Sequence, residues 1–342
     1  MVACGRNPAK LPGPRGVDMV GALGAVPAPA RGPQKGRAAA GGRRICKRER
    51  GMSIGIVGLG NMGRAMAERL EEQGQDLAVW NRTSGRAEGL AARVCDNPRA
   101  VVDNAGIILS MLADDAAIEA VYSGDQGLCT GPLKGRVIVE MSTTSPETAE
   151  ALERRVSEQG GLFLECPVGG TVGPARQGQL LALAGGSPDA FEKARPVLEL
   201  LSRRLEHLGP VGTGAAMKLA INLPLMVYWA ALGEALSLTR QRGIDPARAL
   251  DILADSSGAV ASAKKRIAPI REMLAGGDPG PANFALRNAI KDMKLMEDLA
   301  AQTGRESPVI AAARVTAEAA AEGGMADVDC SMLGLHGQMG GG

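Results

Sequence analysis

Histidine and metal-binding cysteine patterns are almost absent from this chain. Its 342 residues include two histidines, His207 and His336, so a catalytic His–Asp pair or a multi-histidine metal centre has almost nothing to draw on. Six cysteines are scattered without a CxxC pair. This spacing argues against a zinc site or a disulfide framework and favours free thiols in a reducing compartment. We predict no metal and a cytoplasmic location.

Long apolar runs are also missing. The uncharged stretch 219–233 has 15 residues and contains Pro224, whereas a transmembrane helix needs about 20 apolar residues. We therefore expect a buried helix there, and no membrane association. The length suggests two domains, and an apolar content of 45% fits a soluble enzyme.

The first 51 residues differ in composition from the rest. They hold 11 of the 39 Lys and Arg residues but only two of the 37 acids, with many Pro and Gly. We expect residues 1–51 to be a disordered basic extension with no role in the fold, and Met52 to be the true start. Two alternatives stay open. A nucleic-acid arm fits the charge, but the segment has no aromatic residue to stack on a base; a mitochondrial transit peptide fits the arginines, but not the prolines or the lack of serine.

A strand, a glycine turn and a helix follow this segment. Residues 53–58 are a short β-branched apolar run ending in glycine, and a helical pattern runs from Arg64 to Gly74. In a dinucleotide-binding turn, Gly58 allows the bend, Gly60 lets the backbone approach a pyrophosphate, and Gly63 lets helix and strand pack closely. Because the chain has 47 glycines, the motif alone is weak, and its context carries the prediction.

The end of the next strand, 76–80, favours NADPH over NADH. An acidic residue at this position would bind a ribose 2′-hydroxyl and repel a 2′-phosphate. The chain instead has Asn81, Arg82 and Thr83. Asn81 and Thr83 can donate hydrogen bonds, and Arg82 can stack on adenine and pair with a phosphate. The alternative is a solvated arginine in a turn.

Strands and helices then alternate, which predicts a parallel sheet with ligands at the carboxyl ends of its strands. Leu112, Ala113 and Thr143 follow two such strands and are expected on the nicotinamide side of the cofactor site. A glycine-rich loop at 169–178 could form a nest for a carboxylate, although it could also be only a flexible loop. The expected elements are helices at 86–93, 98–104, from 146 and at 188–201, and strands at 107–112, 136–141, 162–168, 179–184 and 205–208.

From residue 212 the pattern is helical. A long helix to about residue 242 carries Lys218 and Asn222 four positions apart, on one face of an otherwise apolar run. Burial would lower the pKa of Lys218 toward the range useful for proton transfer, whereas a lysine reaching solvent from a helix end would not be affected in this way. Pro224 should kink this helix. Further helices are expected at 246–254, 261–274, 284–302 and 308–322, before a frayed glycine-rich terminus.

Taken together, residues 53–335 resemble the β-hydroxyacid dehydrogenases, a family that includes 3-hydroxyisobutyrate, tartronate semialdehyde and glyoxylate/succinic semialdehyde reductases. The resemblance rests on five motifs at the family's spacings: Gly58-Leu59-Gly60-Asn61-Met62-Gly63, Met141-Ser-Thr-Thr-Ser-Pro146, Pro167-Val-Gly-Gly-Thr171, Gly212-x-Gly-x-x-x-Lys218-x-x-x-Asn222 and Lys291-Asp292.

The resemblance implies an α/β Rossmann-type parallel-sheet domain at 52–211 and an all-α domain at 212–342, joined by a long interdomain helix. It implies Lys218 as catalytic acid/base with Asn222 as its partner, Lys291 near the cofactor, and Gly169, Gly170, Thr171 and Asp292 at the substrate. NADP(H) is expected as the preferred cofactor, with NAD(H) possible, in a homodimer or homotetramer acting on a small carboxylate, with neither nucleic acid nor membrane as a partner.

The substrate loop departs from the family pattern Asp-Ala-Pro-Val-Ser-Gly-Gly. Here it begins Glu165-Cys166-Pro167, and Gly169 replaces the serine, which leaves the substrate open. A non-catalytic NADP-binding sensor or scaffold and an imine reductase are the alternatives to an oxidoreductase of hydroxy acids. The imine-reductase relatives lack the lysine that this chain retains as Lys218.

Overall fold

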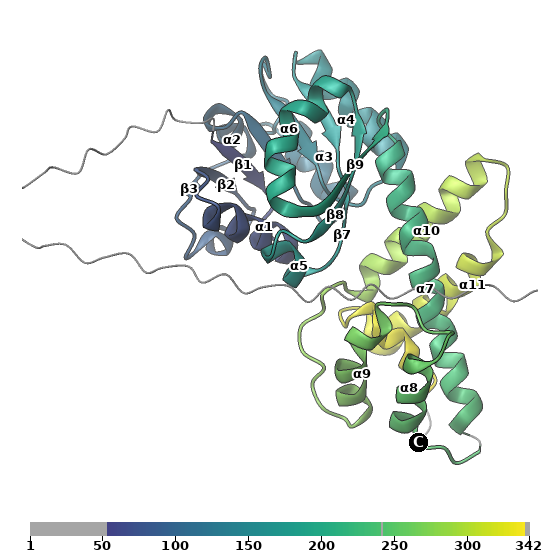
Figure 1. Cartoon of the computed structure of the whole chain (residues 1–342). Coiled ribbons are helices and arrows are strands. Elements are labelled where there is room, and N and C mark those ends of the chain that lie inside the picture. The colour runs from purple at the N-terminus through teal and green to yellow at the C-terminus, as the bar shows by residue number, and fades with distance from the viewer. Residues whose placement is uncertain (1–52, 241, 339–342) are drawn as a thin grey trace, which may run out of the picture. The chain divides into compact units, whose positions relative to one another are not determined.

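A computed structural model describes residues 53–240 and 242–338. The predicted basic extension, 1–51, lies outside the described residues. Nine strands of the described chain form one sheet in the order β3-β2-β1-β4-β5-β6-β8-β7, with β9 paired to β8 (Figure 1). The strands are β1 (Ile54–Val57), β2 (Leu77–Trp80), β3 (Arg93–Val94), β4 (Ile107–Ser110), β5 (Val137–Glu140), β6 (Leu162–Glu165), β7 (Val168–Gly169), β8 (Leu180–Gly186) and β9 (Ser202–Gly209).

The sheet is parallel from β3 through β6 and is covered on both faces. Strand β1 pairs with β2 and β4 in register, and all four of its residues are buried, as expected for a central parallel strand between two helical layers. Core side chains of α1 (Asn61–Glu72) and α6 (Pro188–Leu201) cluster on one face. Those of α2 (Pro98–Asn104), α3 (Asp115–Ser123) and α4 (Pro146–Glu158) cluster on the other. The Rossmann-type prediction is confirmed.

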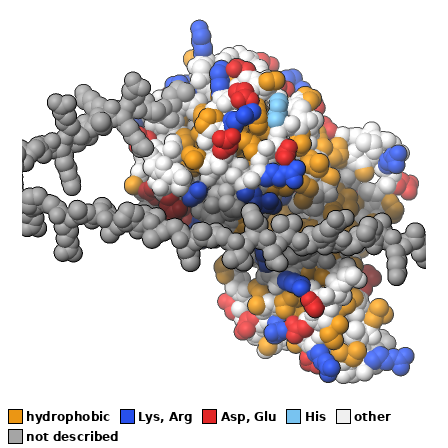
Figure 2. Space-filling view, in the orientation of Figure 1, with side chains coloured by type: hydrophobic (Ala, Val, Ile, Leu, Met, Phe, Trp, Pro, Cys, Tyr) orange, Lys and Arg blue, Asp and Glu red, His pale blue; other side chains and the backbone are white. Residues whose placement is uncertain are grey.

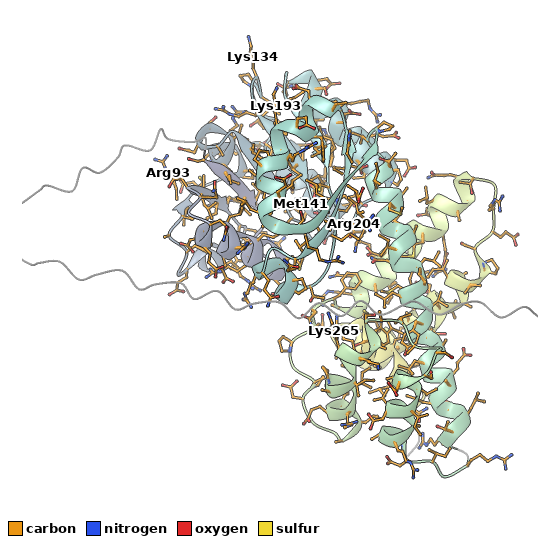
Figure 3. All side chains as sticks on the ribbon, viewed as in Figure 1. Arg93, Lys134, Met141, Lys193, Arg204 and Lys265 are labelled. Atoms are coloured by element: carbon orange, nitrogen blue, oxygen red, sulfur yellow. The ribbon has the colours of Figure 1, made fainter. Side chains whose placement is uncertain are left out.

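Most charged side chains lie on the outside of this domain. Met141, which directly follows β5, is 1% exposed, whereas Lys134 and Lys193 point outward (Figure 3). On the face shown in Figure 2, basic and acidic side chains are intermingled over both the sheet region and the helical region.

The helix predicted at 86–93 is wrong. A single 3-10 turn, η1 (Ser84–Ala87), is followed by strand β3. The carbonyl oxygens of Arg86 and Glu88 accept hydrogen bonds from the Arg64 guanidinium, at 2.9 and 2.7 Å. Gly89 has a left-handed φ of 80°, which a continuing α-helix does not permit.

The glycine-rich loop at 169–178 is more regular than expected. It begins in strand β7, which pairs antiparallel with β8, and contains a short helix, α5 (Val172–Arg176). Ala175 of α5 is fully buried in the same core cluster as α1. This segment is therefore packed against the domain.

Helix α7 (Thr213–Arg240) begins the helical region. It continues through Pro224, which has no N–H to donate to the carbonyl of Ala220. This helix of 28 residues is long and apolar enough to cross a membrane, judged by length and composition alone. The 15-residue uncharged stretch at 219–233 is shorter than that. However, Leu219, Trp229 and Leu236 are buried in the helical core, so its packing is that of a core helix.

The remaining helices share one hydrophobic core with α7. They agree with the predicted helices to within a few residues, except that no helix was predicted at 330–335. They are α8 (Pro246–Asp255), η2 (Ala263–Arg266), α9 (Ile267–Leu274), α10 (Leu286–Gln302), α11 (Pro308–Ala320), a π-helical turn η3 (Ala321–Met325) and η4 (Cys330–Leu335).

A frayed glycine-rich terminus was predicted after residue 322, but η4 shows that the chain is packed as far as Leu335. Residues 339–342 lie outside the described residues. All six residues of η4 are buried, and η4 packs along α7. Small residues permit this close approach, because a Cβ on Gly233 would lie 3.3 Å from the Gly334 carbonyl oxygen. The terminal helix is thus part of the core.

Candidate active site

The three glycines of the turn have different surroundings. Gly58 has a φ of 94°, and a Cβ there would lie 2.2 Å from the Met111 carbonyl oxygen. A Cβ on Gly63 would lie 1.9 Å from the carbonyl oxygen of Gly58. Gly60, in contrast, would meet nothing within 4 Å. The outer two glycines are therefore required by packing, whereas Gly60 faces open space where a phosphate could approach the backbone.

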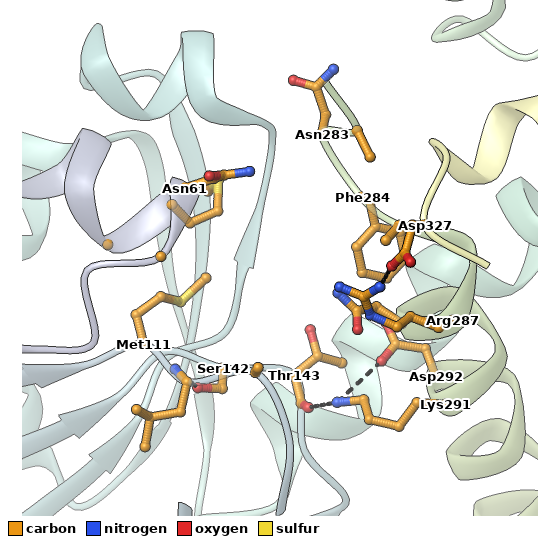
Figure 4. A pocket seen from close by; sticks show the side chains of 18 of the residues that line it. Asn61, Met111, Ser142, Thr143, Asn283, Phe284, Arg287, Lys291, Asp292 and Asp327 are labelled. Carbon is orange, nitrogen blue, oxygen red and sulfur yellow. Dashed lines mark hydrogen bonds and ion pairs between the residues drawn. The ribbon is translucent and has the colours of Figure 1, made fainter. Parts of the chain in front are cut away.

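A cavity of about 490 Å³ opens in front of this turn (Figure 4). One wall comes from the turn and the ends of β4 and β5, and the other from α10 and residues 281–285. Of the predicted site residues, it brings together Gly60, Asn61, Met62, Gly63, Leu112, Ala113, Thr143, Lys291 and Asp292. Nine of the residues predicted at the cofactor or substrate thus share one cavity.

The other predicted residues do not line this cavity; they are Gly58, Leu59, Asn81, Arg82, Thr83, Gly169, Gly170, Thr171, Lys218 and Asn222. Gly58 and Leu59 form the base of the turn. Gly169 ends β7, and Thr171 is the N-cap of α5. The predicted substrate loop therefore lies at the start of α5, outside the cavity lining.

Asn81 uses its side chain inside the protein. Its Oδ1 accepts a hydrogen bond from the Leu59 N–H at 2.8 Å, and its Nδ2 donates to the Thr83 carbonyl oxygen at 3.0 Å. Asn81 thereby fixes the glycine turn against the end of β2. Arg82 and Thr83 are exposed at that strand end, where a cofactor 2′-phosphate would be expected.

Lys218 lies in a buried chain of polar groups. Its Nζ donates to Asn222 Oδ1 at 3.1 Å, and Asn222 Nδ2 donates to Asp292 Oδ2 at 3.1 Å. The three residues are only 9%, 7% and 1% exposed. The predicted pairing and burial of Lys218 and Asn222 are confirmed, and both connect through Asp292 to the cavity.

Burial shifts both ends of this chain toward their neutral forms. Desolvation lowers the pKa of Lys218, and the nearby Asp292 charge opposes that shift. Desolvation likewise raises the pKa of Asp292, opposed by Lys291 and Lys218. A lysine with a lowered pKa and a hydrogen-bonded partner can give and accept a proton near neutral pH.

Lys291 connects α10 to the sheet. Its Nζ donates to the Thr143 carbonyl oxygen at 2.7 Å and lies 3.4 Å from Asp292 Oδ1 (Figure 4). The polar chain from Lys218 therefore ends at the loop that follows β5. One set of contacts links α7, α10 and the loop that follows β5.

A buried carboxylate that the sequence did not indicate supports the loop after β5. Glu140 accepts hydrogen bonds from Tyr122 Oη at 3.0 Å and from the Ser142 N–H at 2.8 Å. Ser142 Oγ in turn accepts from the Leu112 N–H at 2.7 Å. Desolvation raises the pKa of Glu140, and its hydrogen-bond donors oppose the shift. The sequence signal that could have identified Glu140 is an acidic residue directly before the Met141–Pro146 motif.

Residues 281–285, in the wall of the cavity opposite the glycine turn, were also missed as part of the site by sequence reasoning. Asp329 holds them in place by accepting from the Asn283 and Phe284 N–H groups at 3.0 and 3.3 Å. Arg266 pairs with the same carboxylate at 3.0 Å. Arg287 and Asp327 form an ion pair at the cavity mouth (Figure 4). Within the described residues, no cluster of His, Cys, Asp and Glu could hold a metal ion.

Comparisons with known proteins agree with this geometry. Residues 53–209 match the family described as the NAD-binding domain of 6-phosphogluconate dehydrogenase. Residues 212–335 match the family described as NAD-binding of NADP-dependent 3-hydroxyisobutyrate dehydrogenase.

Individual proteins match over most of the chain. Glyoxylate/succinic semialdehyde reductase 1 of Arabidopsis thaliana is 33% identical over 291 residues, covering 82% of this chain and 97% of that protein. The 3-hydroxyisobutyrate dehydrogenase of Pseudomonas aeruginosa is 35% identical over 208 residues, 60% of this chain and 70% of that protein. The structure of Mycobacterium tuberculosis 3-hydroxyisobutyrate dehydrogenase with L-serine shares the fold, with a TM-score of 0.71 at 24% identity, covering 83% of this chain and 98% of that one.

Proposed function

The chain belongs to the β-hydroxyacid dehydrogenases, which are NAD(P)-dependent oxidoreductases, and we propose that it interconverts a small carboxylate semialdehyde or keto acid with its hydroxy acid. The observation that carries this proposal is the placement of a buried Lys218–Asn222–Asp292 chain against the cavity in front of the glycine turn. NADP(H) is the preferred cofactor, and NAD(H) is accepted less well.

The glycine turn fits a dinucleotide. Open space at Gly60 and the free N–H groups at the start of α1 suit a pyrophosphate. Arg82 and Thr83 would hold the 2′-phosphate, and Leu112, Ala113 and Thr143 would flank the nicotinamide. When bound, the cofactor supplies the hydride, and the protein supplies position and charge.

Lys218 handles the proton in this proposal. Its ammonium donates a proton to the oxygen of the carbonyl as that atom gains negative charge, and its amine takes the proton back in the reverse direction. Asn222 orients Lys218, and Asp292 holds Asn222. The N–H groups of Gly169, Gly170 and Thr171 are proposed for the substrate carboxylate, because the family resemblance places them there.

The substrate class follows from the relatives and from the loop. The Arabidopsis relatives are named for glyoxylate and succinic semialdehyde, and the Pseudomonas relative for 3-hydroxyisobutyrate. We assign this chain to the same class of short carboxylates. Gly169 replaces the serine of the family loop, so selection within that class should differ.

The domain boundaries, oligomer and location are part of the same proposal. The sheet domain spans 52–211 and the helical domain 212–342, and α7 is the helix that follows the sheet domain and begins the helical one. Leu238 of α7 is 78% exposed, and Val309 and Val315 of α11 are 59% and 61% exposed. These apolar side chains suit a contact with a second copy in a cytoplasmic homodimer or homotetramer. Analytical ultracentrifugation would measure the state.

A substrate panel tests the proposed function. Purified protein is mixed with NADPH or NADH and with glyoxylate, succinic semialdehyde, other short semialdehydes and keto acids, and loss of absorbance of the reduced cofactor is followed. Consumption with at least one carboxylate, faster with NADPH, is expected. A protein that binds NADPH but consumes none with any member of the panel would be the sensor or scaffold alternative.

Imine reduction is the second candidate, since solved reductive aminases and imine reductases share the fold at 21–23% identity. Adding an amine to the same assay separates the two. Formation of a secondary amine that survives Lys218→Ala would favour the imine reductase.

Asp292→Asn should shift the pH dependence of the reaction. Removing the carboxylate charge removes the interaction that raises the pKa of Lys218, so this pKa should fall further. Reduction needs the protonated lysine, and the alkaline limb of the kcat–pH profile should therefore move to lower pH. Asp298→Asn, an exposed residue on the same helix, is the control. An unchanged kcat–pH profile in Asp292→Asn would count against a role for the hydrogen-bonded Lys218–Asn222–Asp292 chain in proton transfer.

A further inference from the structure

Glu165 is a fully enclosed carboxylate that the mechanism above does not use. It ends strand β6 and is 1% exposed. Its Oε1 accepts hydrogen bonds from the N–H groups of Gly212 and Gly214 at 2.6 and 2.8 Å, and its Oε2 accepts from Ala215 at 3.2 Å. Two of these donors, Gly214 and Ala215, lie in the first turn of α7, and Gly212 directly precedes it.

The surroundings are shaped for this carboxylate. A Cβ on Gly185 would lie 2.3 Å from Glu165 Oε1, and a Cβ on Gly214 would lie 3.2 Å from it. Within residues 53–240 and 242–338, no basic side chain forms an ion pair with Glu165. The negative charge is therefore balanced by the N–H groups and the partial positive charge at the start of α7.

Glu165 joins two parts of the proposed site. On its C-terminal side, Pro167 to Thr171 form the proposed substrate loop. On the α7 side, Gly214, Lys218 and Asn222 are spaced four apart, so they lie along one face of the helix. A rotation or shift of the first turn of α7 would therefore displace the Lys218 amine relative to the substrate loop.

We propose that Glu165 is a positioning residue that holds the start of α7 against the end of β6 and thereby fixes the Lys218 amine relative to the substrate loop. The inference rests on the proposed function and adds to it. Glu165 acts through α7 and does not touch the reacting atoms. The family pattern has Asp at this position, one methylene shorter, and the glycines at 185 and 214 leave room for the longer side chain.

This attachment should depend on pH. Burial raises the pKa of Glu165 to about 7, opposed by its three N–H donors, and Glu150 adds to the rise. The titratable groups that face it are Glu150 from α4 and Cys166, the residue that directly follows β6. Helix α7 and strand β8 contribute backbone to its contacts. Protonation removes an acceptor from the start of α7, so activity should fall as the pH drops through about 7.

Glu165→Gln tests the inference, because it keeps the shape and removes the charge. With a substrate identified from the panel, kcat above neutral pH should fall by about 10- to 100-fold, as expected for a misplaced catalytic group. KM for NADPH should stay within about threefold, and the acid limb near pH 7 should flatten. Glu165→Asp, which keeps the charge but shortens the side chain, should retain that limb at a lower kcat.

Glu150→Gln is the matched control, because it makes the same change in a neighbouring carboxylate that does not hydrogen bond to α7. It should keep kcat and move the acid limb to slightly lower pH. A Glu165→Gln variant with the kcat and pH profile of the parent protein would overturn the inference. So would a variant that melts at a lower temperature but has an unchanged kcat per folded molecule.

An activity-independent measurement separates this inference from the proposed function. The amide proton shifts of Gly212 and Gly214 are followed by NMR as the pH is changed. They should titrate with a midpoint near 7 in the parent protein and stop titrating in Glu165→Gln. If no substrate is found but the amides titrate, the proposed function fails while the attachment of α7 stands. If the Gly212 and Gly214 amide shifts are the same in the parent protein and in Glu165→Gln across the pH range, the inference fails whatever the activity.

Discussion

Lys218→Ala should reduce turnover by about 10²- to 10⁴-fold, the usual contribution of a general acid or base. The Nζ of Lys218 lies 3.1 Å from Asn222 Oδ1, and the side chain is 9% exposed. Water would therefore replace the proton donor poorly. NADPH should still bind, because Lys218 does not line the cavity in front of the glycine turn. Steady-state kinetics and NADPH fluorescence titration measure the two effects separately.

Lys294→Ala is the matched control for that variant. Lys294 is a lysine on α10 with a 57% exposed side chain that pairs with Glu318, and its loss should leave kcat unchanged. Turnover in Lys218→Ala within about tenfold of the parent protein would refute its role as the acid/base. Loss of NADPH binding in the same variant would show that the lysine supports the cofactor instead.

Gly60→Ala should weaken cofactor binding without disturbing the fold. Gly60 has a φ of −61°, which alanine adopts freely, and its Cβ would meet no protein atom within 4 Å. That Cβ would instead occupy the space where a phosphate approaches the backbone. We expect Kd for NADPH to rise by about 10- to 100-fold, or about 1.4–2.8 kcal/mol, with an unchanged melting temperature. An unchanged Kd would mean that the phosphates lie elsewhere.

Gly63→Ala is the contrasting change in the same motif. Its Cβ would lie 1.9 Å from the Gly58 carbonyl oxygen, so strand β1 and helix α1 must move apart. A forced shift of packed backbone costs about 1–3 kcal/mol or more, and Tm should fall together with cofactor affinity. Thermal unfolding of the two alanine variants side by side shows whether this motif serves packing and binding through different glycines.

Local pattern was enough to predict most of the fold. Strand β1 and helix α6 follow from apolar patterns whose signals lie within a few residues of each other. The error at 86–93 has a distant cause, because Arg64 takes the carbonyl groups that a helix would use. A pattern read along the chain does not include such contacts.

The site also combines local motifs, which the sequence predicts, with contacts between residues far apart in the sequence, which it does not. The glycine turn and the Lys218–Asn222 pair are local motifs, and sequence reasoning found them. The contact between Lys291 and Thr143 joins residues 148 positions apart, and the contact between Glu165 and Gly214 joins residues 49 positions apart. Asp292 was expected at the substrate, yet it holds Asn222 and Lys291 inside the protein while lining the cavity. That dual placement depends on how α10 meets α7.

The protonation state of Glu165 that favours thermal stability is not the one that favours catalysis. Because the folded protein raises the pKa of Glu165 to about 7, folding favours the protonated side chain. The contribution of the protonated Glu165 side chain to the free energy of unfolding is fully present below the ordinary pKa of a glutamate. It is lost as the pH rises through about 7, and the loss is on the order of 3 kcal/mol at most. The ionised form that holds α7 is thus the less stable one. A screen that selects variants for survival on heating at alkaline pH would therefore enrich neutral residues at position 165. The selected variants would have a low kcat, because they lack the charge that holds α7.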